Sequence, residues 1–258
     1  MFLLNNSFHD GDFNMSFDMF LVHQLEQRKI LPTLRLYGWK PFAISLGYNQ
    51  SGDFLDKEKC ISENVDVVKR PTGGRAVYHA EELTYAVVMF AGEKNISTIH
   101  NEISQALVCG LKMLGVNAEL SSKQIPSSKI YFGEHSTACF SSITRSEVNV
   151  NGKKIIGSAQ RRFGNIVLQH GSIMIGSEHK SLPKFYREFN ESQFQHLQET
   201  TTEIKTVLGK QISFEEVASV MQHGFEKQWE ISFEQFPETI VEQFFHRNEE
   251  QSFVLSHH

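Results

Sequence analysis

ACFSSITRSEVNVNGKKIIGSAQRRFGNIVLQHGS, residues 138–172, contains the hairpin on which the interpretation of the whole sequence depends. Its centre is Asn151-Gly152, and an Asn-Gly pair between alternating residues is typical of a two-residue hairpin turn, because both turn residues need positive φ. The turn predicts three cross-strand pairs: Val150 with Lys153, Asn149 with Lys154, and Val148 with Ile155.

Strand alternation then places Lys154 on the face opposite to Lys153. A mainly polar set surrounds Lys154 on that face: Glu147, Asn149, Ile156, Ser158 and Gln160. Such a set is more typical of a site than of a packed sheet face, although most strand lysines are simply solvated. Gly157 permits close approach to the backbone. A second predicted turn at Gly164-Asn165 brings three more polar residues beside this hairpin: Gln169, His170 and Ser172.

Composition indicates a globular protein without an obvious nucleic-acid or membrane partner. The chain has 258 residues, is 40% hydrophobic, and has a formal charge of 25 − 30 = −5 with a pI near 6.2. Basic residues nevertheless occur in or beside the motifs: Lys69, Arg70, Arg75, Lys153, Lys154, Arg161 and Arg162. These residues either form a basic site for an anionic partner or are scattered solvated charges.

Cysteine usage indicates a reducing compartment. Cys60, Cys109 and Cys139 are odd in number and lack CxxC spacing, which argues against a disulfide framework and a structural zinc site. We find no signal peptide and no apolar run of membrane-spanning length, so we expect a cytoplasmic protein. Composition alone leaves Cys139 as either a reactive thiol or a small buried hydrophobe.

Periodicity predicts an α+β protein, and we expect one domain over residues 1–258 with a helical subregion from about residue 180 to 258. Predicted helices cover 14–28 (capped by Asp12 or Asn14), 56–63, 97–114 (capped by Ser97 or Thr98), a segment after the capping box Ser213–Glu216, and 239–245. Predicted strands cover 32–39, 43–48, 65–70 and 83–90.

Residues 70–79 connect two of these strands and contain Gly73-Gly74. The pair either makes a plain turn or exposes backbone N–H groups to a ligand, with Arg70 and Arg75 supplying charge. The spacing matches neither a Walker nor a Rossmann fingerprint.

Several motifs together resemble the biotin/lipoate protein ligase family, and most closely its cysteine-dependent octanoyltransferase branch. The segments that carry the resemblance are residues 14–15, 34–39 (LRLYGW), 69–77 with His79 (KRPTGGRAV), 83–85, 138–140 (ACF), 152–160 (GKKIIGSAQ) and 168–172 (LQHGS). Ile156 stands where the family commonly has a small residue, so we expect its side chain to project toward the acyl group.

The resemblance implies the catalytic fold of biotin and lipoate protein ligases, shared with class II aminoacyl-tRNA synthetases: a mixed, largely antiparallel sheet with flanking helices. It implies Cys139 as the nucleophile and Lys154 as the site lysine. It implies a substrate-binding set of Arg70, Thr72, Gly73, Gly74, Arg75, His79, Gly157, Ser158, Ala159, His170 and Gly171. No metal and no cofactor are expected.

The implied reaction moves an octanoyl group from acyl carrier protein to a lysine of a lipoyl domain, in glycine cleavage H protein or an E2 subunit, through a Cys139 thioester. Three alternatives stay open at this point. One is an amidotransferase that moves lipoyl or octanoyl groups between lipoyl domains. The second is an ATP-dependent lipoate ligase, and the third is a non-catalytic protein that only binds lipoyl domains or acyl carriers.

Overall fold

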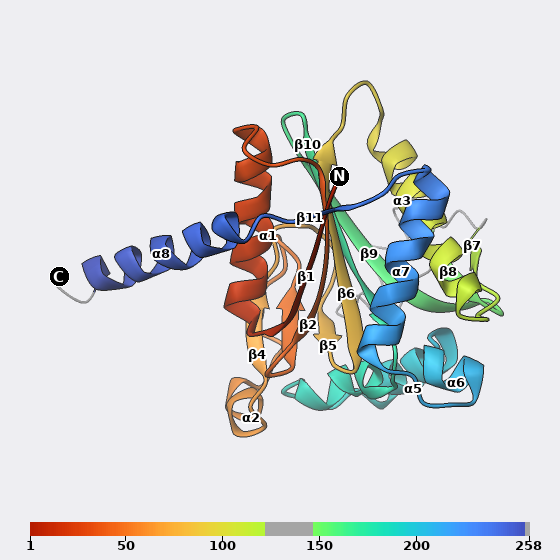
Figure 1. The fold of residues 1–258 in the computed structure, drawn as a ribbon. Coiled ribbons are helices and arrows are strands. Elements are labelled where there is room, and N and C mark those ends of the chain that lie inside the picture. Colours follow the sequence, from red (N-terminus) through yellow and green to blue (C-terminus); the bar gives the residue numbers. More distant parts are fainter. Residues whose placement is uncertain (122–146, 256–258) are drawn as a thin grey trace.

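The computed structural model describes residues 1–121 and 147–255, and the side chains of the last helix as far as residue 246. Within this part, eight strands form one large sheet (Figure 1). Their order is β11 (Glu234–Gln235), β1 (Phe2–His9), β2 (Thr33–Trp39), β6 (Glu82–Phe90), β10 (Ile166–Met174), β9 (Lys153–Phe163), β8 (Val148–Val150) and β7 (Glu119–Leu120). β1 is parallel to β11 and β2, and the other neighbours are antiparallel, as the predicted fold requires.

Three further strands form a second, smaller sheet. Its order is β4 (Asp66–Lys69), β3 (Ala43–Leu46) and β5 (Val77–His79). β3 is parallel to β4 and antiparallel to β5, and the loop from β4 to β5 contains Gly73-Gly74. Gly74 has φ +95°, so the pair makes a turn that needs glycine.

Helices cover both faces of the large sheet (Figure 1). α1 (Gly11–Glu26) packs on one face over an apolar core that includes Phe17, Leu21 and Leu168. α3 (Ile96–Met113) and α7 (Phe214–Trp229) pack on the opposite face over a core that includes Ile103 and Val87. The remaining helices are α2 (Lys57–Ser62), η2 (Glu178–Phe185), α5 (Glu191–Thr200), α6 (Ile204–Leu208) and α8 (Glu238–Leu255).

α3 and α7 cross in close contact because each has a glycine at the crossing point. A Cβ atom added to Gly110 would lie 2.8 Å from the carbonyl oxygen of Val220, and one added to Gly224 would lie 2.5 Å from the Gly110 nitrogen. Both distances are shorter than Cβ atoms tolerate. The two helices therefore approach backbone to backbone over the core.

The observed helix caps differ from the predicted ones at two helices. Asp10, not Asp12 or Asn14, caps α1 by accepting a hydrogen bond from the Phe13 N–H. Asn95 caps α3 by accepting from the Thr98 N–H. The apolar stripe locates a helix but not its first turn, where several adjacent polar residues satisfy the same preference. The capping box at Ser213 and Glu216 is confirmed.

The predicted Asn-Gly hairpin is confirmed, but one of its three pairs is wrong. Asn151 and Gly152 have φ +49° and +77°, and Val150 and Asn149 pair with Lys153 and Lys154. Val148 pairs with Ile156 instead of Ile155, because β9 has a β-bulge at this point. The extra residue lets both isoleucines pack in the core beneath α3.

Candidate functional site

A cavity opens between α1, the small sheet and the middle of the large sheet. Its empty volume is about 350 Å³, part of it open to solvent. Its lining includes seven of the residues that the motifs predicted: Arg70, His79, Gly157, Ser158, Ala159, His170 and Gly171. They come together because β9 and β10 pair antiparallel, with Ser158 opposite Gly171 and Ala159 opposite His170.

Sequence reasoning did not select several residues of the cavity wall: Met15, Tyr37, Trp39, Ser45, Val77 and Thr84. Ser172 also lines the cavity, and the second turn predicted its position beside the hairpin. The wall is largely apolar because of four residues: Met15, Tyr37, Trp39 and Val77. In the sequence, each of them is equally typical of an ordinary core residue. All the residues that sequence reasoning did not select, except Ser45, lie in segments that carry the family resemblance, and Arg35 is a further signal, because it is a charge within the otherwise apolar strand Leu34–Tyr37.

Arg70 organises the loop between β4 and β5 from the inside. Its side chain is almost fully buried and donates to the backbone oxygens of Ser45, Gly73 and Arg75 at 3.0, 2.8 and 2.7 Å. The loop also presses against β3, since a Cβ atom on Gly47 would lie 1.9 Å from the Gly74 oxygen. The guanidinium thus closes the loop around itself, and Gly73, Gly74 and Arg75 lie outside the cavity lining.

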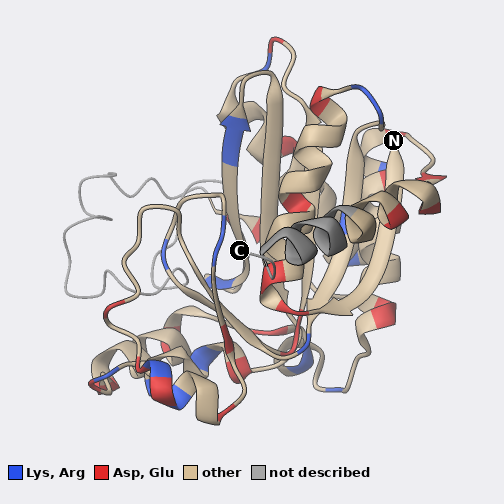
Figure 2. Ribbon diagram, turned by 90° about the vertical axis from the view of Figure 1, so that its left-hand side faces the viewer, with Lys and Arg blue, Asp and Glu red and all other residues tan. Residues whose placement is uncertain are grey.

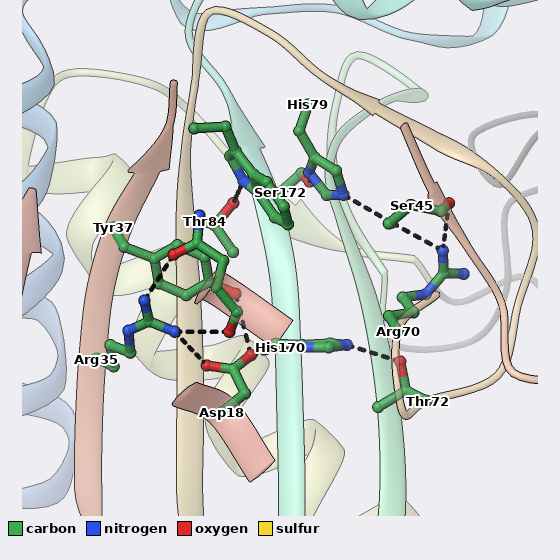
Figure 3. Close-up of polar contacts among 12 residues, drawn as sticks. Asp18, Arg35, Tyr37, Ser45, Arg70, Thr72, His79, Thr84, His170 and Ser172 are labelled. Carbon is green, nitrogen blue, oxygen red and sulfur yellow. Dashed lines mark hydrogen bonds and ion pairs between the residues drawn. The ribbon is translucent and has the colours of Figure 1, made fainter. Parts of the chain in front are cut away.

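Two histidines of the cavity wall have the same pattern of partners (Figure 3). On one side, His79 Nδ1 lies 2.8 Å from Glu82 Oε1, and its Nε2 lies 2.7 Å from the Ser45 hydroxyl. Ser172 and Thr84 also donate to Glu82 Oε1, and Trp39 Nε1 donates to Thr84. The indole of Trp39 stacks on His79 with ring centroids 4.1 Å apart.

On the other side, His170 is held between α1 and the β4–β5 loop (Figure 3). Its Nδ1 lies 2.9 Å from Asp18 Oδ2, and its Nε2 lies 2.7 Å from the Thr72 hydroxyl. Asp18 also accepts from Tyr37 at 3.0 Å and forms an ion pair of 2.7 Å with Arg35. The side chains of Asp18 and Arg35 are both fully buried.

Burial and ion pairing together set the charges in this network. Burial alone favours the neutral acid at Asp18, but Arg35 and His170 outweigh it and hold the pKa of Asp18 below its ordinary value. Burial lowers the pKa of His170 despite the neighbouring carboxylate. Burial, reinforced by Asp18, raises the pKa of Tyr37 well above its ordinary value. At neutral pH the network therefore contains Asp18 as an anion, His170 neutral and Tyr37 as a phenol.

Lys154 lies in β9, next to the turn that joins β8 to β9 and three residues before Gly157. Its side chain is 1% exposed, and its ammonium is 2.6 Å from Glu147 Oε1. Its backbone oxygen accepts from the Thr202 N–H at 2.9 Å. Burial lowers the pKa of nearby His100 in α3, with Glu147 and Lys154 acting in opposite directions. Lys154 is not part of the cavity lining among the described residues, and the predicted Cys139 lies outside them.

The structure also bears on the expectations for Ile156 and for the basic residues of the motifs. Ile156 is fully buried in the core beneath α3 and is not among the described residues that line this cavity, so the cavity gives no support to the expectation that Ile156 faces the acyl group. Its pairing with Ile173 fixes its direction toward this core. Of the seven basic residues in or beside the motifs, Arg70 and Lys154 are buried and do not contribute to an exposed basic surface, and Figure 2 shows basic and acidic positions interspersed along the ribbon.

Residues 1–121 and 147–246 contain no cluster of three or more His, Cys, Asp or Glu side chains suited to hold a metal ion. No helix in the described part of the chain is both long enough and apolar enough to cross a membrane.

Comparison with known proteins adds a family model and curated relatives. The model of the lipoyl protein ligase A/B catalytic domain matches residues 10–226. The octanoyltransferase LipM of Clostridioides difficile is 31% identical over 90% of this chain and 88% of its own length. The octanoyltransferase LipM of Oceanobacillus iheyensis is 34% identical over 93% of this chain and 88% of its own.

Solved structures resemble the chain in fold. A lipoate-protein ligase A bound with ATP superposes with a TM-score of 0.71 at 21% identity, covering 95% of this chain and 94% of its own. A bipartite lipoate protein ligase from Thermoplasma acidophilum gives a TM-score of 0.72 at 21% identity, covering 95% of this chain and 91% of its own. At this identity the likeness establishes the shared fold alone.

Proposed function

Because the chain belongs to the family of lipoyl protein ligase A/B catalytic domains, we propose that it is an acyltransferase that moves an octanoyl group onto a lysine of a lipoyl domain. The observation that carries the proposal is identity of 31 to 34% to curated octanoyltransferases LipM over 90% or more of the chain. These relatives favour octanoyl transfer over the amidotransferase, ligase and binding-only alternatives.

The apolar character of the cavity wall, rather than the volume of the cavity, supports an acyl substrate. The apolar wall comes from Met15, Tyr37, Trp39 and Val77. The polar lining consists of the two histidines, Arg70 and four hydroxyl side chains: Ser45, Thr84, Ser158 and Ser172. Each CH₂ group that leaves water for such a wall contributes roughly 0.8 kcal/mol to binding. An octanoyl chain therefore gains enough from burial for the enzyme to discriminate against shorter acyl groups.

The proposed chemistry has two steps. The Cys139 thiolate attacks the carbonyl carbon of a thioester donor, a new C–S bond forms, and the donor thiolate leaves. The lysine ε-amine of the lipoyl domain then attacks the enzyme thioester, an amide forms, and the Cys139 thiolate leaves. The amine loses one proton in the second step, and Lys154 is the proposed group that stabilises the thiolate or accepts this proton.

The proposed donor is octanoyl acyl carrier protein, and the proposed acceptors are glycine cleavage H protein or an E2 subunit. No nucleotide is required in this scheme, because the donor thioester already supplies the driving force. Lys69 and Arg162 are exposed near the loop and the β9 end, where they offer positive charge to an acidic carrier. A cytoplasmic location and a single catalytic domain over residues 1–258 belong to the same proposal.

Intact-mass measurement tests the mechanism directly. After mixing with octanoyl acyl carrier protein, and without ATP, the protein should gain the mass of one octanoyl group that hydroxylamine removes. Cys139→Ser should not form this thioester and should not transfer to the lipoyl domain. Cys60→Ser and Cys109→Ser are the matched controls, and both should be acylated like the wild type.

Two results would contradict the proposal. Transfer at the wild-type rate by Cys139→Ala would exclude the thioester intermediate. A strict requirement for ATP, with free octanoate or lipoate as substrate, would support a ligase instead.

A further inference from the structure

His170 links two parts of the molecule that are far apart in sequence. Asp18 lies in α1, His170 lies 152 positions later in β10, and Thr72 lies in the loop between β4 and β5. All three side chains are buried, with His170 itself lining the cavity. The carboxylate and the loop hydroxyl approach opposite nitrogens of the same ring (Figure 3).

The donors and acceptors of this chain fix where the ring proton lies. Asp18 accepts from Arg35 at one oxygen and from Tyr37 at the other, and its pKa is held below the ordinary value, so it is an anion with no proton to give to the ring nitrogen 2.9 Å away. The hydrogen therefore lies on His170 Nδ1. Nε2 of the neutral ring then carries a lone pair, and the Thr72 hydroxyl must be the donor in the 2.7 Å contact.

We propose that Asp18 is a positioning residue of the site: it keeps the proton of His170 on Nδ1 and so makes Nε2 the acceptor that anchors Thr72 and its loop against the acyl cavity. The proposal deepens the octanoyl-transfer function and rests on it for its kinetic consequence. Asp18 itself does not line the cavity, so it acts on the acyl group only through Tyr37, His170 and the loop.

The anchor matters because Thr72 follows Arg70 by two residues in the loop. Arg70 lines the cavity and is hydrogen-bonded to the loop's own carbonyls, so the loop and the guanidinium move together. Within the loop, the hydrogen bonds of Arg70 fix its shape. The Thr72–His170 bond and the 2.8 Å bond from Arg161 of β9 to the Pro71 carbonyl together hold the loop against the large sheet, and the Thr72–His170 bond is the contact with β10. Loss of that bond should therefore displace the Arg70 wall of the cavity.

The first test is the tautomer of His170 in the wild-type protein, read from the ¹⁵N shifts of the ring nitrogens and their couplings to the carbon-bound ring protons. We expect a neutral ring with the proton on Nδ1, the less common form of free histidine. A proton on Nε2, or a mixture of the two forms, would overturn the proposal. Asp18→Asn should move the proton to Nε2, because the amide oxygen is needed by Arg35 and the NH₂ group then faces the ring.

The second test is kinetic and leaves the Asp18–Arg35 ion pair intact. Thr72→Val should raise KM for octanoyl acyl carrier protein about tenfold, with a smaller change in kcat, because the cavity wall is displaced while the reacting groups remain. Thr72→Ser should restore KM to near the wild-type value. Thr33→Val is the matched control, since it removes a buried hydroxyl that donates to the Leu31 carbonyl, away from the cavity.

An unchanged KM in Thr72→Val, or no recovery in Thr72→Ser, would overturn the anchoring role. These results are distinguishable from failure of the proposed function. If the protein transferred no octanoyl group, the tautomer and its change in Asp18→Asn would still decide whether Asp18 controls the ring.

Discussion

Two adjacent lysines in the hairpin differ completely in environment. Lys153 is exposed, and its ammonium lies 3.3 Å from the Gln198 carbonyl. Lys154 is buried beside Glu147. Removing one partner of a buried ion pair is costly, because the other charge then loses a compensating neighbour. The same substitution at the two positions should therefore have very different effects on folding as well as on transfer.

Lys154→Met should lower the free energy of unfolding by about 3 kcal/mol, since it removes the buried ammonium that lies 2.6 Å from the Glu147 carboxylate. It should also nearly abolish transfer if Lys154 has the proposed chemical role. Lys153→Met should change stability by about 0.5 kcal/mol or less and retain activity. Urea unfolding together with the transfer assay measures both properties, and equal effects of the two variants would contradict the assignment.

Several polar and glycine residues of the cavity lining were predictable from the sequence, whereas its large apolar residues were not. His79, His170 and the Gly157–Ala159 segment stood out because their motifs are ordered and specific. Trp39 and Met15 also lie in segments that carry the resemblance, but they were not assigned to the site, because an apolar wall residue and a core residue obey the same periodicity. Asp18 was also missed, since a carboxylate on a helix usually lies in solvent and its partner is 152 positions away.

Among the elements, the crossing of α3 and α7 depends on two glycines in contact. Gly224→Ala should destabilise the protein by about 1 to 3 kcal/mol, because the new methyl group meets the backbone of Gly110 and not a flexible side chain. Ser219→Ala, on the exposed side of the same helix, is the control and should change stability by about 0.5 kcal/mol or less.

Thermal unfolding of the two variants provides the measurement. If Gly224→Ala were as stable as the wild type, α3 and α7 could move apart without a loss of stability, which would contradict the prediction. The same variant should leave the ring tautomer of His170 unchanged, since α7 lies on the opposite face of the sheet from α1.

Long periodic elements were predictable, whereas short and irregular ones were not. The apolar stripe of α3 buries one face of the helix, whereas β2 and most of β6 are buried on both faces, and all three elements are apparent in the sequence. β1 was missed because Asn5, Asn6 and Ser7 interrupt its alternation, and its pairing with β2 shifts there while Ser7 takes φ +58°. The β9 bulge could not be predicted from the sequence. Val148 could pair with Ile155 or with Ile156, and both pairings place an isoleucine in the core.

For the whole molecule, buried histidines make folding stability depend on pH. Burial, with a smaller contribution from Lys180, lowers the pKa of His179 to about 4. In the unfolded chain the same ring titrates near 6.5, so between these values the unfolded state binds more protons. The stabilisation is thus fully present above pH of about 6.5 and is lost progressively as the pH falls toward about 4. His170 and His100, whose pKa values burial also lowers, contribute in the same direction.

Urea unfolding at pH about 7.5 and about 5 measures this dependence. His179 alone should contribute about 2 kcal/mol to the loss of stability between the two conditions. His179→Gln should remove that part of the difference, whereas His23→Gln, at an exposed position of α1, should not. Equal pH dependence in the wild type and His179→Gln would contradict the assignment to this residue.

The bond between Asp18 and His170 also determines when the site is formed during synthesis. A ribosome delivers α1 long before β10, and the carboxylate has no histidine to hold until at least residue 170 has left the exit tunnel. Until then Asp18 and Arg35 are available to each other, but the loop that contains Thr72 has nothing to be anchored against. Contacts of such long sequence separation form late and slowly. A nascent chain that stalls before β10 should therefore be inactive, and it should expose the apolar residues of β6 that pair with β10 in the folded protein.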